Sequence, residues 1–125
     1  MNGTEPQIFA HDLLRIEILT GADNIEVRWS GKSAQREPGR FISPVLADVL
    51  DRSHELKKPV VLDFRELAFM NSASLTPIIK VLDRAKRSSL NLVLQYDRSI
   101  KWQDLNFSAL RIFETADRRV EVRGL

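Results

Sequence analysis

The stretch from Pro59 to Ile79 constrains the fold more than any other part of the chain. It opens with PVVLDF, residues 59–64, an apolar run that only Asp63 interrupts. Such a short apolar run is typical of a strand that is covered on both faces of a sheet. The residues that follow place apolar side chains at helical spacing: Leu75, Ile78, Ile79, Leu82 and Ala85. We therefore expect a strand that leads directly into a helix, the unit from which α/β folds are built.

The same alternation continues on both sides of this stretch. Residues 13–19 and 25–31 read as a hairpin, because the turn GADN joins two partly alternating runs. Residues 90–96 and 118–124 read as further strands, helical spacing occurs within 41–56, and a third helix is expected within 99–113. Helices connect the later strands, so these strands should be parallel. The sequence thus predicts an α/β fold of order β-β-α-β-α-β-α-β, a mixed sheet of about five strands with helices packed against it.

Local chemistry suggests where the helices begin. Ser43 and Pro44 suit the N-cap and the first position of the first helix. Pro77 is tolerated only in a first helical turn, so the second helix should begin near Ser74. The polar residues 1–11 are expected to be loosely ordered, and residues 12–124 to form a single domain.

Composition narrows the class of protein. The chain has no cysteine, which excludes disulfides, thiol catalysis and cysteine-ligated metals, and it fits a reducing cytoplasm. Its 19 basic and 17 acidic residues are interspersed, unlike the one-sided basic charge of nucleic-acid-binding proteins. No apolar run approaches the roughly 18 residues of a membrane span, and the N-terminus lacks the pattern of a secretory signal. We expect a cytoplasmic protein without membrane insertion or nucleic-acid binding.

The sequence offers little catalytic chemistry. His11 and His54 do not follow predicted strands, where α/β folds usually place a catalytic base. The His, Asp and Glu residues lack metal-ligand spacing, and the glycines of residues 31–39 match no phosphate-binding loop. We expect neither enzyme activity nor a cofactor or metal, although an enzyme using Asp63, Asn71 and Ser72 stays an alternative.

Asn71, Ser72 and Ser74 form an unusual polar cluster between the strand and the helix. One serine there could cap the helix, which stabilises a protein by about 1 kcal/mol. Two serines and an asparagine exceed that need. A phosphoserine would instead meet the positive end of the helix dipole and add about −1.5 to −2 charges at neutral pH. Both interpretations, a cap and a phosphorylation switch, fit the residues themselves.

At this point VVLDFRELAFMNSASL resembles the signature of the STAS domain family, which includes the anti-sigma-factor antagonists. That signature has a strand Asp, then an apolar pair, then Asp-Ser-Ser-Gly-Leu at a helix start. Asp63 matches the strand Asp, and Phe69-Met70 the apolar pair. Ser72 matches the phosphorylated serine, and Leu75 the final Leu. The resemblance in element order spans about residues 12–124 and implies a STAS-like (SpoIIaa-like) fold.

The sequence departs from this signature at two informative positions. Asn71 stands where the family has Asp, and Ala73-Ser74 where it has Ser-Gly. Asn followed by a phosphorylatable hydroxyl is closer to a bacterial branch similar to the biofilm regulator SiaC. The resemblance then implies a non-enzymatic bacterial signalling regulator, in which phosphorylation of Ser72 switches partner binding.

The resemblance also implies partners and a contact surface. The partners would be proteins: a serine kinase or anti-sigma-factor-like protein, and a PP2C-type phosphatase. The switch surface would comprise Asn71, Ser72, Ala73, Ser74 and Asp63, with charge contacts from Lys32, Arg36 and Arg40 in the loop before the first helix. Alternatives are a scaffold, or a domain that senses a small ligand or nucleotide, without phosphorylation.

Overall fold

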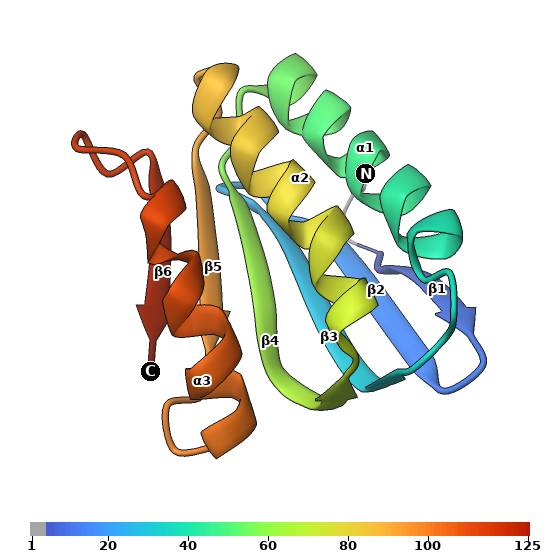
Figure 1. The fold of residues 1–125 in the computed structure, drawn as a ribbon. Coiled ribbons are helices and arrows are strands. Elements are labelled where there is room, and N and C mark those ends of the chain that lie inside the picture. Colours follow the sequence, from blue (N-terminus) through green and yellow to red (C-terminus); the bar gives the residue numbers. More distant parts are fainter. Residues whose placement is uncertain (1–4) are drawn as a thin grey trace.

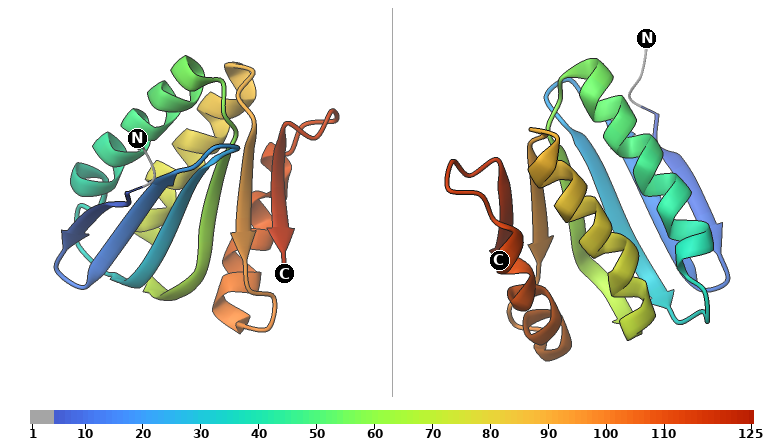
Figure 2. Two further views of the ribbon diagram at one scale, coloured as in Figure 1. Left: turned by 180° about the vertical axis from the view of Figure 1, so that it is seen from behind. Right: turned by 45° about the horizontal axis from the view of Figure 1, so that its top comes forward.

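In the computed structural model, which describes residues 5–125, the strands form one six-stranded sheet that follows their order in the sequence. The helices cover one face of this sheet and leave the other face open (Figures 1 and 2). The elements are β1 (Gln7–His11), β2 (Leu14–Thr20), β3 (Ile25–Ser33), α1 (Gly39–Leu56), β4 (Val60–Met70), η1 (Ser72–Ser74), α2 (Leu75–Arg87), β5 (Leu92–Tyr96), α3 (Lys101–Ser108), η2 (Ala109–Phe113) and β6 (Val120–Gly124).

The strand directions agree with the predicted topology. β2 and β3 form the expected antiparallel hairpin, and β3, β4, β5 and β6 run parallel to one another. The prediction of five strands is one short, because β1 pairs antiparallel with β2 within the segment expected to be loosely ordered. Residues 1–4 of that segment lie outside the described part of the chain.

β1 is a strand because its pairing positions suit both faces of the sheet. Phe9 lies opposite Ile16 and packs against the core, while Ile8 lies opposite Glu17 on the open face. The segment carries no long apolar run, so its strand character depends on tertiary pairing with β2 rather than on its own composition.

The core lies between the sheet and the helices. Leu62 and Phe64 of β4 are fully buried, and the ring of Trp29 of β3 packs against Phe64 in a tilted arrangement, with ring centroids 4.7 Å apart. The open face instead carries polar residues in register across the strands: Glu17, Arg28, Asp63, Gln95 and Arg123. This one-sided burial explains why polar and apolar residues alternate along β2, β3 and β6.

The first helix begins earlier than the sequence suggests. Its N-cap is Pro38, and the N–H of Ile42 donates to the carbonyl of Pro38 at 2.9 Å. Ser43 and Pro44 therefore lie inside α1, and the prediction that they begin the helix is wrong. The apolar residues Ile42, Val45 and Leu46 face the core, so their burial outweighs the backbone hydrogen bond that Pro44 cannot make.

β4 extends beyond β5 and carries the start of α2. Pairing of β4 with β5 ends at Asp63 and Gln95, whereas pairing with β3 continues to Met70 opposite Ser33. Figure 1 shows this part of β4 curving away from β5. The buried Gln103 of α3 satisfies backbone groups that β5 no longer reaches. Its amide donates to the carbonyls of Phe64 at 2.9 Å and Leu67 at 3.0 Å.

None of the helices within residues 5–125 is both long enough and apolar enough to span a membrane.

Candidate functional site

The polar cluster lies where β4 ends and α2 begins. Asn71 is extended (φ −78°, ψ 165°), Ser72–Ser74 form the short 3-10 helix η1, and α2 continues from Leu75. α1 starts at the same end of the molecule, so two helix N-termini and the loop before α1 meet there (Figure 1). The second helix thus begins where Pro77 requires.

Asn71 is the residue that caps this turn. Its Oδ1 accepts hydrogen bonds from the Ser74 backbone N–H at 3.0 Å and from Ser74 Oγ at 2.6 Å. Its Nδ2 donates to the carbonyl of Gln35 at 2.8 Å, in the loop before α1. Its backbone N–H donates to the Ser33 carbonyl at 2.9 Å. One side chain therefore caps the helix and ties it to the neighbouring loop.

Ser74 belongs to the interior. It is 0% exposed, and its Oγ lies 2.6 Å from Ser33 Oγ. Because Ser74 Oγ donates to Asn71, Ser33 is left to donate to Ser74. Two corrections follow. Ser74 is not part of a contact surface in this conformation, and neither Ser72 nor Ser74 makes the side-chain cap, because Asn71 already does.

Ser72 and Ala73 are exposed at the outside of the turn. No hydrogen bond to Ser72 Oγ is found within residues 5–125, whereas Ser74 Oγ contacts both Asn71 and Ser33. The two serines thus have opposite environments. Addition of a group to Ser72 Oγ would not break an interaction that supports the turn.

The loop residues predicted to contribute charge also lie at this end. Lys32 is exposed and pairs in register with Phe69, and Arg36 is exposed next to Gln35, which Asn71 binds. Arg40 is exposed but forms an ion pair with Glu37 at 3.0 Å. Asn71 thus brings the loop against the turn, and the turn and the loop form one continuous surface.

Two apolar residues also contribute to this surface. Leu13 is 68% exposed and Phe69 is 45% exposed. Lys32 connects them, because its N–H donates to the Leu13 carbonyl at 3.0 Å and its register partner is Phe69. Phe69 was already noted as half of the apolar pair that resembles the family signature, but nothing in the sequence marks Leu13 as exposed.

Asp63 does not share this surface. It lies on the open face of the sheet in the middle of β4, is 8% exposed and pairs with Arg65 at 2.8 Å. Burial raises the pKa of Asp63, but hydrogen bonds from the Arg65 side chain and backbone N–H outweigh burial and hold that pKa below its usual value. Asp63 is therefore a structural ion-pair member, and its assignment to the switch surface is corrected.

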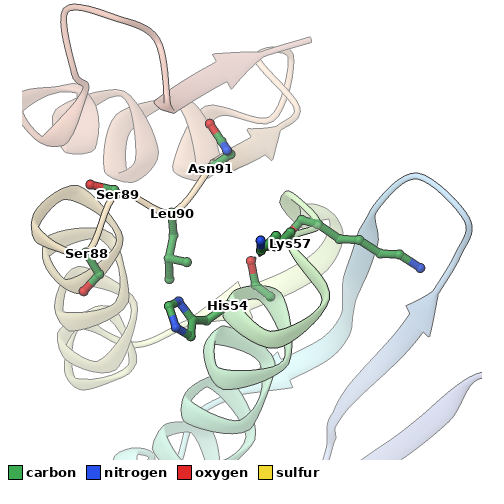
Figure 3. Close-up of a pocket in the computed structure, with 8 residues that line it drawn as sticks. His54, Lys57, Ser88, Ser89, Leu90 and Asn91 are labelled. Carbon is green, nitrogen blue, oxygen red and sulfur yellow. Dashed lines mark hydrogen bonds between the residues drawn. The ribbon is translucent and has the colours of Figure 1, made fainter.

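The arrangement gives little support for an active site. Asp63, Asn71 and Ser72 line none of five surface hollows found in residues 5–125. Within the same residues there is no group of three or more His, Asp or Glu side chains that could hold a metal ion. His54 lines a hollow of about 280 Å³ between the C-terminal ends of α1 and α2 (Figure 3). Ser72 lies before the opposite, N-terminal end of α2.

Comparison with known proteins defines the fold. No family model matches the chain, and no curated protein sequence matches it. Among solved structures, the fold is similar to that of an anti-sigma factor antagonist from Mycobacterium paratuberculosis. The TM-score is 0.59 at 13% sequence identity, over 88% of this chain and 93% of that chain. The predicted STAS-like α/β fold is therefore confirmed, with six strands rather than about five.

Proposed function

We propose that this protein is a non-enzymatic signalling regulator of the anti-sigma-factor-antagonist type, whose binding to a protein partner is controlled by phosphorylation of Ser72. The observation that carries the proposal is the contrast between the two serines. Ser74 is buried in a hydrogen-bond network, while Ser72 is exposed and its Oγ has no hydrogen bond within the described residues. A kinase can reach Ser72, and the turn does not depend on its hydroxyl.

The surroundings of Ser72 support both binding states. The unmodified surface offers apolar contacts through Leu13 and Phe69, which a partner can bury. A phosphate on Ser72 adds charge and hydration to this surface, so a partner packed there would be released. The cationic side chains of Lys32 and Arg36 are exposed on the same surface and are suited to interact with the phosphate.

Asn71 favours a branch of the family similar to SiaC. Its amide donates to the Gln35 carbonyl, a bond that the aspartate of the common signature cannot make. On this proposal the partners are a serine kinase or anti-sigma-factor-like protein and a PP2C-type phosphatase, and the protein acts in a bacterial cytoplasm. Asn71, Ser72 and Ala73, with Lys32, Arg36 and Arg40, form the switch surface.

The test is to isolate the protein from its native cell and to compare partner capture by variants. We expect phosphate on Ser72 by mass spectrometry. Wild type and Ser72→Ala should capture the same partner, and Ser72→Asp should capture at least about tenfold less, corresponding to ~1.4 kcal/mol. Ser88→Asp is the matched control, since it places the same charge on an exposed serine at the far end of α2.

The other outcomes would contradict this proposal or favour a different function. Equal capture by wild type, Ser72→Ala and Ser72→Asp, together with Ser72 that never carries phosphate, would favour a scaffold without a switch. Loss of capture by Ser72→Ala in a folded protein would contradict the proposed unmodified binding state. Release of the partner by a nucleotide, with no change on phosphorylation, would favour a small-ligand sensor.

A further inference from the structure

α3 and η2 carry a second apolar face opposite the buried one, and of its residues Trp102 also packs against the core. Gln103, Phe107 and Leu110 point inward and are buried. On the outer side, Leu105 is 73% exposed and Ile112 is 77% exposed, with Ala109 exposed between them and Trp102 partly exposed at one end. We call Trp102, Leu105, Ala109 and Ile112 the outer stripe.

The spacing of the outer stripe is helical throughout. Trp102, Leu105 and Ala109 recur at the three- and four-residue intervals of one α-helix face. Ala109 and Ile112 are three apart in the 3-10 segment, where such residues lie one above the other. The stripe is therefore a continuous strip on the surface rather than a set of isolated apolar residues, and a strip of this kind indicates a binding surface.

We propose that the outer stripe binds the same stripe of a second copy of this chain, in an antiparallel arrangement about a two-fold axis. In such an arrangement each residue faces the residue equally far from the middle of the stripe in the other copy. Trp102 then faces Ile112, and Leu105 faces Ala109. A large side chain lies opposite the small alanine, and the two bulky residues pack end to end.

Charges that flank the stripe support this occupant over an unrelated partner. The antiparallel pairing places Lys101 of one copy near Glu114 of the other, and Asp104 of one copy near Arg111 of the other. Both pairs are of opposite sign, and each occurs twice because of the symmetry. Lys101, Arg111 and Glu114 are exposed. Glu114 also accepts a hydrogen bond from the Val122 N–H through one oxygen, which leaves its second oxygen for Lys101.

The stripe and the switch surface lie on different elements. α3 and η2 lie over the β5–β6 side of the sheet, while α1 and the β1–β2 side lie at the other side (Figures 1 and 2). Stable interfaces bury about 1,200–2,000 Å² of surface in total. The four side chains of the outer stripe in each copy supply less than this. We therefore expect a weak dimer that forms at high protein concentration.

Sedimentation of the full chain across a concentration series tests the proposal. Wild type should pass from monomer to dimer, and Ile112→Glu should raise the dissociation constant about 100-fold, because each dimer would bury two new carboxylates. Leu13→Glu is the matched control, since Leu13 is similarly exposed but lies on the switch surface. A wild-type protein that stays monomeric up to about 1 mM overturns the proposal. A dimer that Leu13→Glu disrupts and Ile112→Glu preserves overturns it too.

Cysteine cross-linking tests the antiparallel register, since the natural chain has no cysteine. A mixture of Lys101→Cys and Glu114→Cys proteins should form a mixed disulfide at least about tenfold faster than either protein forms its own, since like positions lie at opposite ends of the paired stripes. Faster self-pairing of Lys101→Cys would indicate parallel stripes and refute the stated arrangement. Because the readout is self-association, its failure leaves the proposed role of Ser72 unaffected.

Discussion

Replacement of Asn71 by aspartate separates the two roles of this side chain. The carboxylate of Asn71→Asp can still accept hydrogen bonds from the Ser74 N–H and Oγ, so the cap is kept. It cannot donate to the Gln35 carbonyl, which lies 2.8 Å from the present amide nitrogen. Two acceptors would then face each other, and we expect the loop of residues 34–37 to move away from the turn.

The hydrogen bonds of Asn71 determine how much each substitution should lower the free energy of unfolding. Loss of the hydrogen bond to Gln35 costs about 0.5–1.5 kcal/mol, and repulsion between the oxygens adds to this. A carboxylate at a helix N-terminus stabilises the folded protein by about 0.3–1 kcal/mol. We expect Asn71→Asp to lower the free energy of unfolding by about 1 kcal/mol. Asn71→Ala removes the cap as well and should lower it by about 2–3 kcal/mol.

Urea unfolding with an unchanged m-value measures these differences, and hydrogen exchange of residues 34–37 reports the loop. Asn91→Asp is the control for added charge, because Asn91 is exposed, and it should change stability by less than about 0.5 kcal/mol. If Asn71→Asp is as stable as wild type and its loop exchanges no faster, the hydrogen bond to Gln35 does not hold the loop in place. The preference for asparagine over aspartate at this position would then need a different physical cause.

Two further perturbations test the sheet that supports the site. Gln103→Leu leaves the buried carbonyls of Phe64 and Leu67 without their donor, so we expect a loss of about 3 kcal/mol in urea unfolding; a loss below about 1 kcal/mol would refute this role. Asp63→Asn should be less stable than wild type at pH 7. Since the folded-state pKa of Asp63 is lowered, its stabilisation is present above the unfolded pKa of about 3.9 and is lost as pH falls through the folded value. The difference between Asp63→Asn and wild type should therefore shrink below about pH 4, and a constant difference from pH 7 to pH 2 would contradict the ion-pair role.

The sequence predicts the parallel half of the fold well because its signals are strong and local. The run before Phe64 is buried on the helix side, and the stripe from Leu75 to Ala85 packs on the same core. β1 was missed because Gln7–His11 becomes a strand only through its pairing with β2. The start of α1 was misplaced because Ser43-Pro44 is a good local start signal, yet burial of Ile42 extends the helix past it.

The position of the polar turn can be predicted from the sequence, but the role of each residue in it cannot. The sequence places Asn71, Ser72 and Ser74 at one turn, and they lie at one turn in the structure. It cannot show which hydroxyl points inward, because that depends on Ser33, from a distant strand, lying 2.6 Å from Ser74 Oγ. For the same reason Asp63 was grouped with the turn: its place on the open face depends on sheet register rather than on its neighbours in the chain.

The extension of β4 beyond β5 has a mechanical consequence. Past Asp63, β4 is held by strand pairing on the β3 side only, and on its other side by the side chain of Gln103. Strain applied at Ser72 should therefore pass into β3 and the start of α1 and should largely spare β5 and β6. The hydrogen bonds of Gln103 fix the point beyond which the end of β4 can move. Gln103 belongs to α3, which also carries part of the outer stripe, so any coupling between the turn and that stripe should run through the hydrogen bonds of Gln103.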